Sequence, residues 1–326
     1  MAVTEEDVVW CYRSFLGRNP ESAETALRHA SSAKDFRSLV LLFVSCQEFR
    51  NKNAYPTWLP LNKGEMDLDV TASAADLSLM RDRIREAWTH LGDVRPHFSV
   101  LTNPSFLPES LDDNSLGRFY ESGVAEVALI DAVLRRHGFS HPDSKTCVEF
   151  GCGLARVTLA LATKFKKVHG YDISPNHLAI AEKRASDSGI HNVKFHLCPP
   201  DGIKKLEDCD FFYSRIVFQH NPPPLIKELI RTSLKSLRAG AIGIFQVPTY
   251  MQGYSFRIKE YLSSPRKLNL EMHCIPQSEI FSAIAEADCK LLEVREDGST
   301  GLPGRWISNT FVVQRPGRAP RHSRRP

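Results

Sequence analysis

The chain has 326 residues, with 42 Lys and Arg against 38 Asp and Glu and a net charge of +4. Five of the positive charges are arginines in the last twelve residues, which leaves the rest of the chain at −1. A near-neutral body excludes the clustered basic surface that nucleic-acid binding needs. A hydrophobic fraction of 42% excludes wholesale disorder, and the length predicts one large domain plus a smaller unit.

The N-terminus and the cysteines bear on the compartment. The opening MAVTEEDVVW is acidic where a signal peptide is basic, and no apolar run of membrane-spanning length follows. The eight cysteines contain no C-x-x-C pair, which excludes zinc-ribbon patterns and favours reduced thiols. We therefore expect a cytoplasmic protein with no membrane span and no bound metal.

Residues 1–54 are predicted to form a small helical module. Residues 4–7 have a capping-box pattern and precede an apolar face at helical spacing. Gly17 is expected to end this first helix and Pro20 to open the second. Ser residues at 31–32 are expected to precede a third helix, which completes the module.

Residues 55–115 are predicted to contain a linker and one amphipathic helix. Two prolines and a glycine in residues 55–64 indicate the linker. Apolar residues then repeat at helical spacing from Leu77 to Leu91, and an irregular stretch follows. A helix over residues 116–137 is expected to begin the main domain.

From residue 145 short apolar runs alternate with helical stretches, which predicts a doubly wound, Rossmann-like α/β sheet. The expected strands are 146–150, 167–173, 193–197, 211–214, 242–247, 290–295 and 309–314, and the expected helices are 157–165, 177–186, 224–237 and 276–287. Pro248 is expected to end the fifth strand because proline cannot donate to a ladder. An aromatic-rich insertion follows at 249–274, which is expected to form either a lid or a packing segment. The domain is predicted to span 116–315, before a disordered basic tail at 316–326.

The first strand of this sheet ends in a glycine-rich turn, E-F-G-C-G-L-A-R, at residues 149–156. Gly151 and Gly153 let the backbone turn tightly and let a ligand approach it. The helix that follows presents free N–H groups to that ligand. Asp172 ends the second strand, where a carboxylate can accept both hydroxyls of a ribose. The turn and the acid together predict a ligand that contains a nucleoside.

Two residues discriminate between the candidate nucleosides. A dinucleotide fingerprint needs a small residue where this chain has Arg156, and Glu149 would face a pyrophosphate with like charge. An acid is instead compatible with the ammonium group of S-adenosylmethionine (SAM). The residues therefore favour SAM as the cofactor, and an NAD-dependent oxidoreductase is the alternative that Arg156 opposes.

From about residue 116 to residue 314 the chain resembles the class I SAM-dependent methyltransferases of the small-molecule type. The resemblance rests on the glycine-rich turn, on G-Y-D-I-S at 170–174 and on the stretch at 210–240. It implies a reversed last strand, with residues 309–314 beside residues 290–295. The sequence departs from the pattern at Ala155, where many members have a third glycine.

The resemblance also implies a role for each matching residue. Glu149, Gly151 and Gly153 would line the methionine end of SAM, Asp172 the ribose and Ile173 the adenine face. Asp201 is the candidate for the adenine amino group, Ser214 and Arg215 would border the methyl group, and Tyr120 with Gly123 would cap the carboxylate.

Methyl transfer depends mainly on alignment, and a general base helps when the acceptor is a hydroxyl group. His220, just past the fourth strand, and His273, near the end of the insertion, are the candidate catalytic residues. The N-P-P-P at 221–224 is interpreted as a helix start, because it lies seven residues past the strand and lacks the aromatic residue of base-methylating enzymes. We expect methyl transfer to an oxygen or nitrogen of a small molecule or glycan precursor. The alternative is a SAM-binding or scaffold protein without turnover.

The N-terminal module has a resemblance of its own. Its Y-R-S-F-L-G-R-N-P at 12–20 and S-C-Q-E-F at 45–49 resemble a small helical domain of unknown function. That domain recurs in bacterial surface and glycan-related proteins. The resemblance implies a bacterial source and a glycan context.

Overall fold

A computed structural model describes residues 3–53, 64–299 and 306–317. The chain divides into two compact units near residue 63, and each unit is described by itself. Apart from Gly64, Pro316 and Gly317, the expected linker at 55–64 and the expected tail at 316–326 lie outside the described residues.

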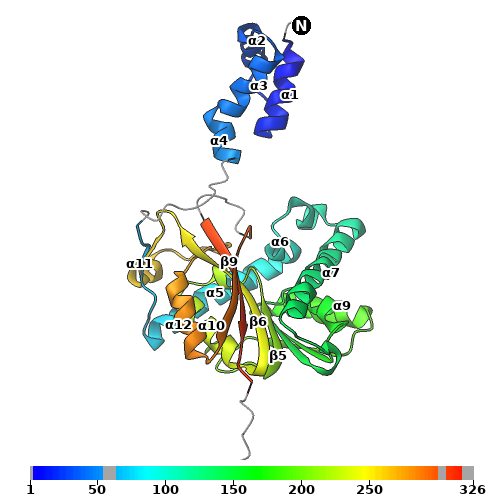
Figure 1. Ribbon diagram of the computed structural model, residues 1–326, viewed down its shortest axis with the longest axis vertical. Helices are drawn as coiled ribbons and strands as arrows, with labels where there is room; N and C mark the ends of the chain where they lie inside the picture. The colour runs from blue at the N-terminus through cyan, green and yellow to red at the C-terminus, as the bar shows by residue number, and fades with distance from the viewer. Residues whose placement is uncertain (1–2, 54–63, 300–305, 318–326) are drawn as a thin grey trace, which may run out of the picture. The chain divides into compact units, whose positions relative to one another are not determined.

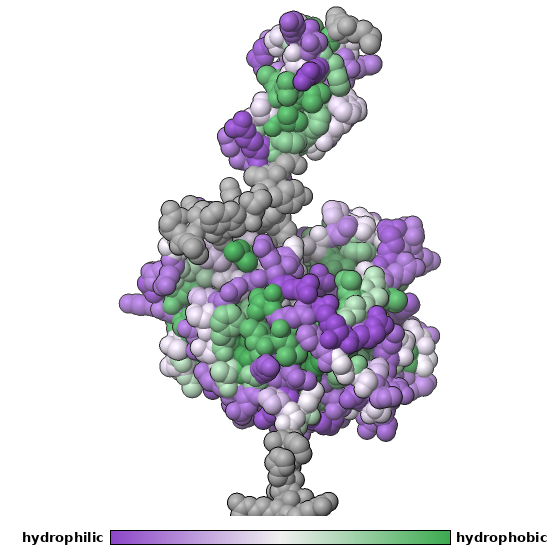
Figure 2. All heavy atoms as spheres, viewed as in Figure 1, coloured by the Kyte–Doolittle hydropathy of each residue, from purple (hydrophilic) through white to green (hydrophobic). Residues whose placement is uncertain are grey.

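The first unit contains four helices around a small apolar core. The helices are α1 (Glu5–Leu16), α2 (Ala23–Ser32), α3 (Phe36–Ser45) and α4 (Gln47–Asn53). The capping box at the start of α1 is present, and Gly17 ends the helix at φ 63°. Ser22, rather than Pro20, caps α2, and Asp35 caps α3, so Ser31 and Ser32 belong to the end of α2. Figure 2 shows that some apolar residues of this unit also lie at its surface.

The second unit is built on a seven-stranded sheet with the order β4-β3-β2-β5-β6-β9-β8 (Figure 1). The strands are β2 (Thr146–Phe150), β3 (Lys167–Asp172), β4 (Val193–Leu197), β5 (Cys209–Ser214), β6 (Leu237–Met251), β8 (Lys290–Asp297) and β9 (Trp306–Gln314). The first five strands in this order pair in parallel, and β9 runs antiparallel to both of its neighbours. The doubly wound sheet and its reversed last strand are therefore confirmed.

Helices cover both faces of this sheet (Figure 1). On one face α10 (Pro223–Lys235) and α12 (Gln277–Glu286) pack against Phe212, Phe245 and Phe311. On the other face α7 (Asp113–Arg136) and α8 (Thr158–Ala162) pack against Phe211 and Ile244. The remaining helices are α5 (Ala74–Val94), α6 (Pro96–Val100), α9 (Pro175–Asp187) and α11 (Ile258–Ser263). Within the described ranges, no helix combines the length and the apolar composition that a membrane span needs.

Two features differ from the sequence-based expectation. The strand β6 does not stop at Pro248 but continues to Met251, with a shift of register between Pro248 and Tyr250. An irregularity of this kind accommodates the missing N–H group of proline. The second unit also begins before residue 116, because the predicted amphipathic helix, α5, packs against α9, α10 and α11. Residues 64–115 therefore belong to the same compact unit as the sheet.

A short parallel pair connects the start of this unit to the insertion after β6. Strand β1 (Asp67–Leu68) pairs with β7 (Ser255–Phe256). Arg257 extends this connection through ion pairs with Asp67 and Asp69. The insertion is thus attached to the segment that leads into α5.

Candidate functional site

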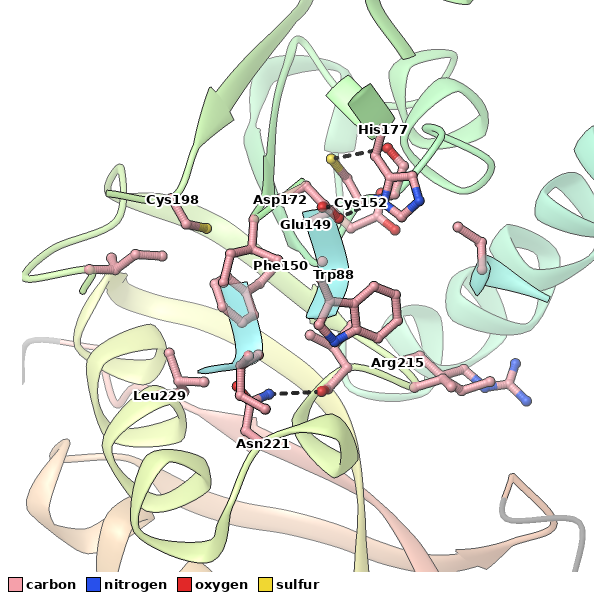
Figure 3. Close-up of a pocket in the computed structure, with 18 of the residues that line it drawn as sticks. Trp88, Glu149, Phe150, Cys152, Asp172, His177, Cys198, Arg215, Asn221 and Leu229 are labelled. Carbon is pink, nitrogen blue, oxygen red and sulfur yellow. Dashed lines mark hydrogen bonds and ion pairs between the residues drawn. The ribbon is translucent and has the colours of Figure 1, made fainter. Parts of the chain in front are cut away.

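A cavity lies at the carboxyl ends of β2, β3 and β5, where α/β sheets usually bind ligands (Figure 3). The helices α5 and α6 supply its opposite wall. Residues from both sides that line the cavity include Ile84, Trp88, Ser99, Val100, Glu149, Gly151, Gly153, Asp172, Ile173, His177, Arg215, Asn221 and Leu229.

The glycine-rich turn forms the floor of the cavity. Gly151 and Gly153 have φ values of 75° and 51°, in the left-handed region that favours glycine. A Cβ atom on Gly151 would lie 2.2 Å from the Val217 side chain, and one on Gly153 would lie 2.8 Å from Val100. Ala155 also has a left-handed φ, of 64°, which explains why glycine suits that position. The turn therefore needs glycine for both conformation and space.

Asp172 is buried at the end of β3 and is held from both sides by backbone groups. The N–H of Gly153 donates to its Oδ2 at 2.8 Å, and the N–H of Ser174 donates to its Oδ1 at 2.9 Å. Each carboxylate oxygen keeps capacity for a further donor. The carboxylate is thus fixed in the cavity wall, with capacity left to accept from a ligand.

Glu149 is buried at the end of β2, and burial raises the pKa of its carboxyl group to about 8. The Thr158 hydroxyl donates to Glu149 Oε2 at 2.5 Å and opposes this rise, while the nearby Glu126 adds to it. The group is mainly protonated at neutral pH. A cation placed beside it would favour the ionised form.

A buried ion-pair cluster borders the cavity near the end of β5. Arg156 Nη2 lies 2.6 Å from Glu126 Oε2, and the Tyr213 hydroxyl donates to the other oxygen of Glu126. Arg215 Nη1 lies 3.4 Å from the same carboxylate. Arg156 occupies the sequence position at which a dinucleotide fingerprint has a small residue. Its side chain instead pairs with Glu126 of α7.

The strand β5 is followed by a strained residue in the cavity wall. Ile216 has a φ of 57°, which is an outlier for a β-branched side chain. Its N–H donates to Gln246 Oε1 at 2.8 Å, and this bond holds the conformation. Backbone strain of this kind gathers at functional sites.

Four of the predicted cofactor residues are not in the described cavity lining: Asp201, Tyr120, Ser214 and Gly123. Gly123 lies against the backbone of Arg156, where a Cβ atom would be 1.9 Å from the carbonyl oxygen. Asp201 is exposed and pairs with Lys204 at 3.0 Å. The guanidinium carbon of Arg184 lies over the Tyr120 ring, 4.4 Å from the ring centroid. Ser214 is buried, and its hydroxyl donates to a backbone carbonyl at the end of β2. Each of these three side chains is satisfied by a protein partner instead.

The two predicted catalytic histidines come together, although 53 positions separate them in the chain. His220 Nδ1 lies 2.7 Å from the Glu271 carbonyl oxygen, and His273 Nε2 lies 3.3 Å from the Glu271 carboxylate. Within the described residues neither one lines the cavity. The ring of His220 instead packs edge-on against Trp88, which does line it, with centroids 5.1 Å apart. Burial lowers the pKa of His220 to about 4, so this ring is neutral at pH 7.

Trp88, Ser99 and His177 line the cavity and were not predicted from the sequence. His177 had a local signal, since it lies in the first turn of the helix that follows Asp172. Trp88 and Ser99 gave none, because they precede the α/β pattern. Figure 3 shows Trp88 in the middle of the site, with His177 and Asp172 toward one end and Asn221 toward the other.

These groups fit SAM. Asp172 suits the ribose, Glu149 suits an ammonium group, and the apolar lining residues Ile173, Ile203 and Leu229 suit an adenine ring. The arginines at the cavity are engaged by glutamates or backbone carbonyls, so they do not form a free pyrophosphate site.

Comparison with known proteins adds independent findings. Residues 147–240 match the family model of a methyltransferase domain. The magnesium protoporphyrin IX methyltransferase of Synechocystis, solved with bound S-adenosylhomocysteine (SAH), is 14% identical, with a TM-score of 0.51 over 72% of this chain and 99% of that chain. A SAM-dependent methyltransferase of Clostridium acetobutylicum is 13% identical, with a TM-score of 0.47 over 61% of this chain and 92% of that chain. No curated protein matches the sequence.

At 14% identity the Synechocystis structure shows the fold alone. The match over residues 147–240 supplies the activity, and the cavity contains the groups that this activity needs at the expected strand ends. The chain is therefore a SAM-dependent methyltransferase of the class I fold, with S-adenosylmethionine as its cofactor.

Proposed function

We propose that the protein transfers the methyl group of SAM to an oxygen or nitrogen atom of a small molecule, with glycan precursors as the first class to test. The observation that carries this proposal is the shape of the cavity. Beyond Asp172 and the glycine-rich turn it continues to Trp88 and Asn221, next to the buried cluster of His220, Glu271 and His273. A walled space beside these polar groups suits a small acceptor.

The residues divide the work between the two ligands. When bound, SAM supplies an electrophilic methyl group. In the proposal Asp172 binds the ribose, Glu149 the amino group and Ile173 the adenine face, while Arg215 borders the reaction space. Alignment of the acceptor with the methyl group then provides most of the rate enhancement.

His220 is suited to orient an acceptor by accepting a hydrogen bond. A carbonyl oxygen only accepts, so the contact with Glu271 requires the proton of neutral His220 to be on Nδ1. Its Nε2 then has a free lone pair. With a pKa of about 4 this nitrogen is a weak base, so it holds a hydroxyl or amine in place more readily than it removes a proton. Trp88 lines the cavity and packs against His220, so the proposal requires Trp88 to move aside when an acceptor binds.

His273 acts through Glu271 in this proposal. Its Nδ1 lies 2.6 Å from the Tyr254 hydroxyl, and its Nε2 faces the carboxylate of Glu271. Tyr261 donates to the same carboxylate at 2.8 Å. His273 is therefore a positioning residue for the segment that holds His220.

The source and the compartment belong to the same proposal. All eight cysteines lie in the described residues and are free thiols, which agrees with a reducing, cytoplasmic setting. The resemblance of the N-terminal module supports a bacterial source and a glycan-related acceptor.

Turnover with radiolabelled SAM and a panel of sugars, hydroxy compounds and amines tests the proposal. His220→Gln and His273→Gln are expected to lower turnover at least tenfold while the dissociation constant for SAH stays unchanged. His191→Gln, at an exposed position, is the control. Wild-type rates in the His220 variant would remove it from the mechanism. SAM binding without turnover on any acceptor would favour the scaffold alternative.

A further inference from the structure

The outer side of α7 carries apolar residues that no described element of the second unit covers. Val124 and Leu129 are 63% and 67% exposed, the highest values among the large apolar side chains of the described residues. Three exposed alanines, Ala125, Ala128 and Ala132, lie between and beside them on the same helix. We call these five residues the α7 face. Scattered exposed apolar side chains are ordinary, whereas several gathered on one side of a helix indicate a contact surface.

The apolar surface continues from the helix into a second cavity. Leu129 lines this cavity together with Ile130, Val133 and, on β6, Ile244. Helix α7 forms the outer layer over this part of the sheet (Figure 1). A partner that covers the α7 face therefore also covers the opening beside Leu129.

Two opposite charges frame the α7 face at equal distances from its centre. Glu121 lies seven residues before Ala128, and Arg135 lies seven residues after it. Seven residues make almost two helical turns, so the three side chains lie on one side of the helix, each charge about 10 Å along the axis from Ala128. Both charged side chains are exposed, and neither has an ion-pair partner in the described part of the chain.

This arrangement of charges is complementary to itself. If two copies of α7 cross in antiparallel directions about a two-fold axis at Ala128, Glu121 of each copy faces Arg135 of the other, and the axis generates this pair twice. A parallel crossing would instead place like charges opposite each other. The small alanine side chains at the crossing point allow the two helices to approach closely. The charges therefore favour a second copy of this chain as the partner.

We propose that the α7 face is the interface of a homodimer, in which two α7 helices pack antiparallel around Ala128. Burial of Val124 and Leu129 from both copies provides most of the favourable free energy. The two pairs of Glu121 and Arg135 fix the orientation of the copies. The proposal goes beyond the methyl-transfer activity and is independent of the cofactor and of the acceptor.

The same helix connects this interface to the cofactor cavity. Its inner side carries Glu126, which lines the cavity and pairs with Arg156. Glu126 also lines the second cavity beside Leu129. The partner copy thus packs on the outer side of a helix whose inner side contributes to the site.

Sedimentation velocity of the full chain over a series of concentrations tests the proposal. We expect a dimer whose dissociation constant rises at least tenfold in Glu121→Arg and in Arg135→Glu, because each change replaces attraction by repulsion at two places. The double variant, Glu121→Arg with Arg135→Glu, restores opposite charges and should dimerise like the wild type. A general loss of stability would not be reversed in this way.

The apolar part of the interface has its own variant and control. Leu129→Glu should abolish the dimer. Leu42→Glu changes a leucine of α3 that is 47% exposed, and it should leave the dimer intact. Loss of the dimer in the Leu42 variant alone would assign the contact to the first unit and overturn the proposal.

A cross-link measures the predicted geometry in a chain that keeps its charges. Ala128→Cys places a thiol beside its own copy, so mild oxidation should link two chains through a disulfide bond. Ser186→Cys, at an exposed position on α9, is the control, and the oxidised wild type gives the background from the native cysteines. The proposal is overturned if the chain is monomeric throughout the series, if the dimer survives both Glu121→Arg and Leu129→Glu, or if the control cross-links equally well.

Discussion

Asp172 is held by the two turns that border it, one from the glycine-rich segment and one from the start of α9. We expect Asp172→Asn to weaken SAH binding by about 1–3 kcal/mol, because an amide cannot accept from all the donors that face the carboxylate. Calorimetric titration measures the change. Asp187→Asn, at an exposed position on α9 paired with Lys183, serves as the control. An unchanged affinity in a folded Asp172 variant would contradict the ribose assignment.

The raised pKa of Glu149 predicts that cofactor binding depends on pH. Its pKa of about 8 in the free protein leaves it mainly protonated at pH 7. An ammonium group bound beside it lowers this pKa, so binding releases a proton and the affinity for SAH rises with pH up to about 8. The rise is at most about tenfold per pH unit. Titrations in buffers of different ionisation enthalpy count the released proton, and Glu149→Gln should show neither the release nor the slope.

A comparison of Gly151 with Gly189 distinguishes the cost of backbone strain from the cost of a Cβ atom that has no space. Both have positive φ values, 75° and 65°, but a Cβ atom on Gly189 meets no atom within 4 Å. Gly189→Ala is expected to cost about 1 kcal/mol of unfolding free energy and to bind SAH normally. Gly151→Ala should cost more and should abolish SAH binding, because its Cβ overlaps Val217 in the cavity wall. Urea unfolding and calorimetry measure both effects, and similar behaviour of the two variants would contradict the tight turn.

The sequence located the local parts of the site and missed the distant ones. Gly151, Gly153 and Asp172 lie at strand ends, so the position in the pattern was sufficient to find them. Trp88 and Ser99 reach the cavity only through the packing of α5 and α6, which no local pattern reveals. Asp201 illustrates the reverse case, since the third strand was predicted correctly but its following loop directs that side chain to Lys204.

At the scale of elements, Arg83 connects α5 to the insertion. This buried side chain donates to the backbone oxygens of Tyr261, Ser264 and Pro265 and lies over the Tyr261 ring, 4.3 Å from its centroid. Arg83→Met removes the guanidinium donors from all three oxygens, of which only that of Tyr261 keeps another donor, the Ser264 hydroxyl. We therefore expect a loss of about 2–4 kcal/mol of unfolding free energy. Urea unfolding measures the loss.

The control for this change is another arginine between the same two segments. Arg266 pairs with Glu86, and both side chains are about half exposed. Surface pairs contribute little, so Arg266→Met is expected to change the free energy by less than about 1 kcal/mol. Equal losses in the two variants would show that Arg83 has no special role in holding the insertion.

The strands were easier to predict than their ends. All seven strands of the main sheet were predicted from their short apolar runs, which are most continuous in buried parallel strands. The two-residue strands β1 and β7 gave no such signal. The end of β6 was wrong because a proline is tolerated where the register shifts. The antiparallel direction of β9 came from the family resemblance, since periodicity contains no information on direction.

At the scale of the whole molecule, the two units differ in what they contribute to the cofactor site. Every described residue that lines the cavity lies between residues 81 and 229, within the second unit. We expect a fragment of residues 64–326 to fold and to bind SAH with the affinity of the full chain. Calorimetry and thermal unfolding of both proteins test this. A large loss of affinity in a folded fragment would show that the N-terminal module takes part in cofactor binding.

The wall formed by α5 and α6 has a consequence for local motion. Both helices precede the matched domain, yet they carry Trp88, Ser99 and Val100 to the ligand. A cofactor that binds only the assembled wall stabilises it against local opening by about 2.7 kcal/mol at a hundredfold excess over its dissociation constant. Amide protons of α5 and α6 that exchange through this opening should therefore exchange about a hundredfold more slowly with SAH bound. In this way a ligand held at the strand ends controls the order of a segment that ends more than forty residues before the first strand of the sheet.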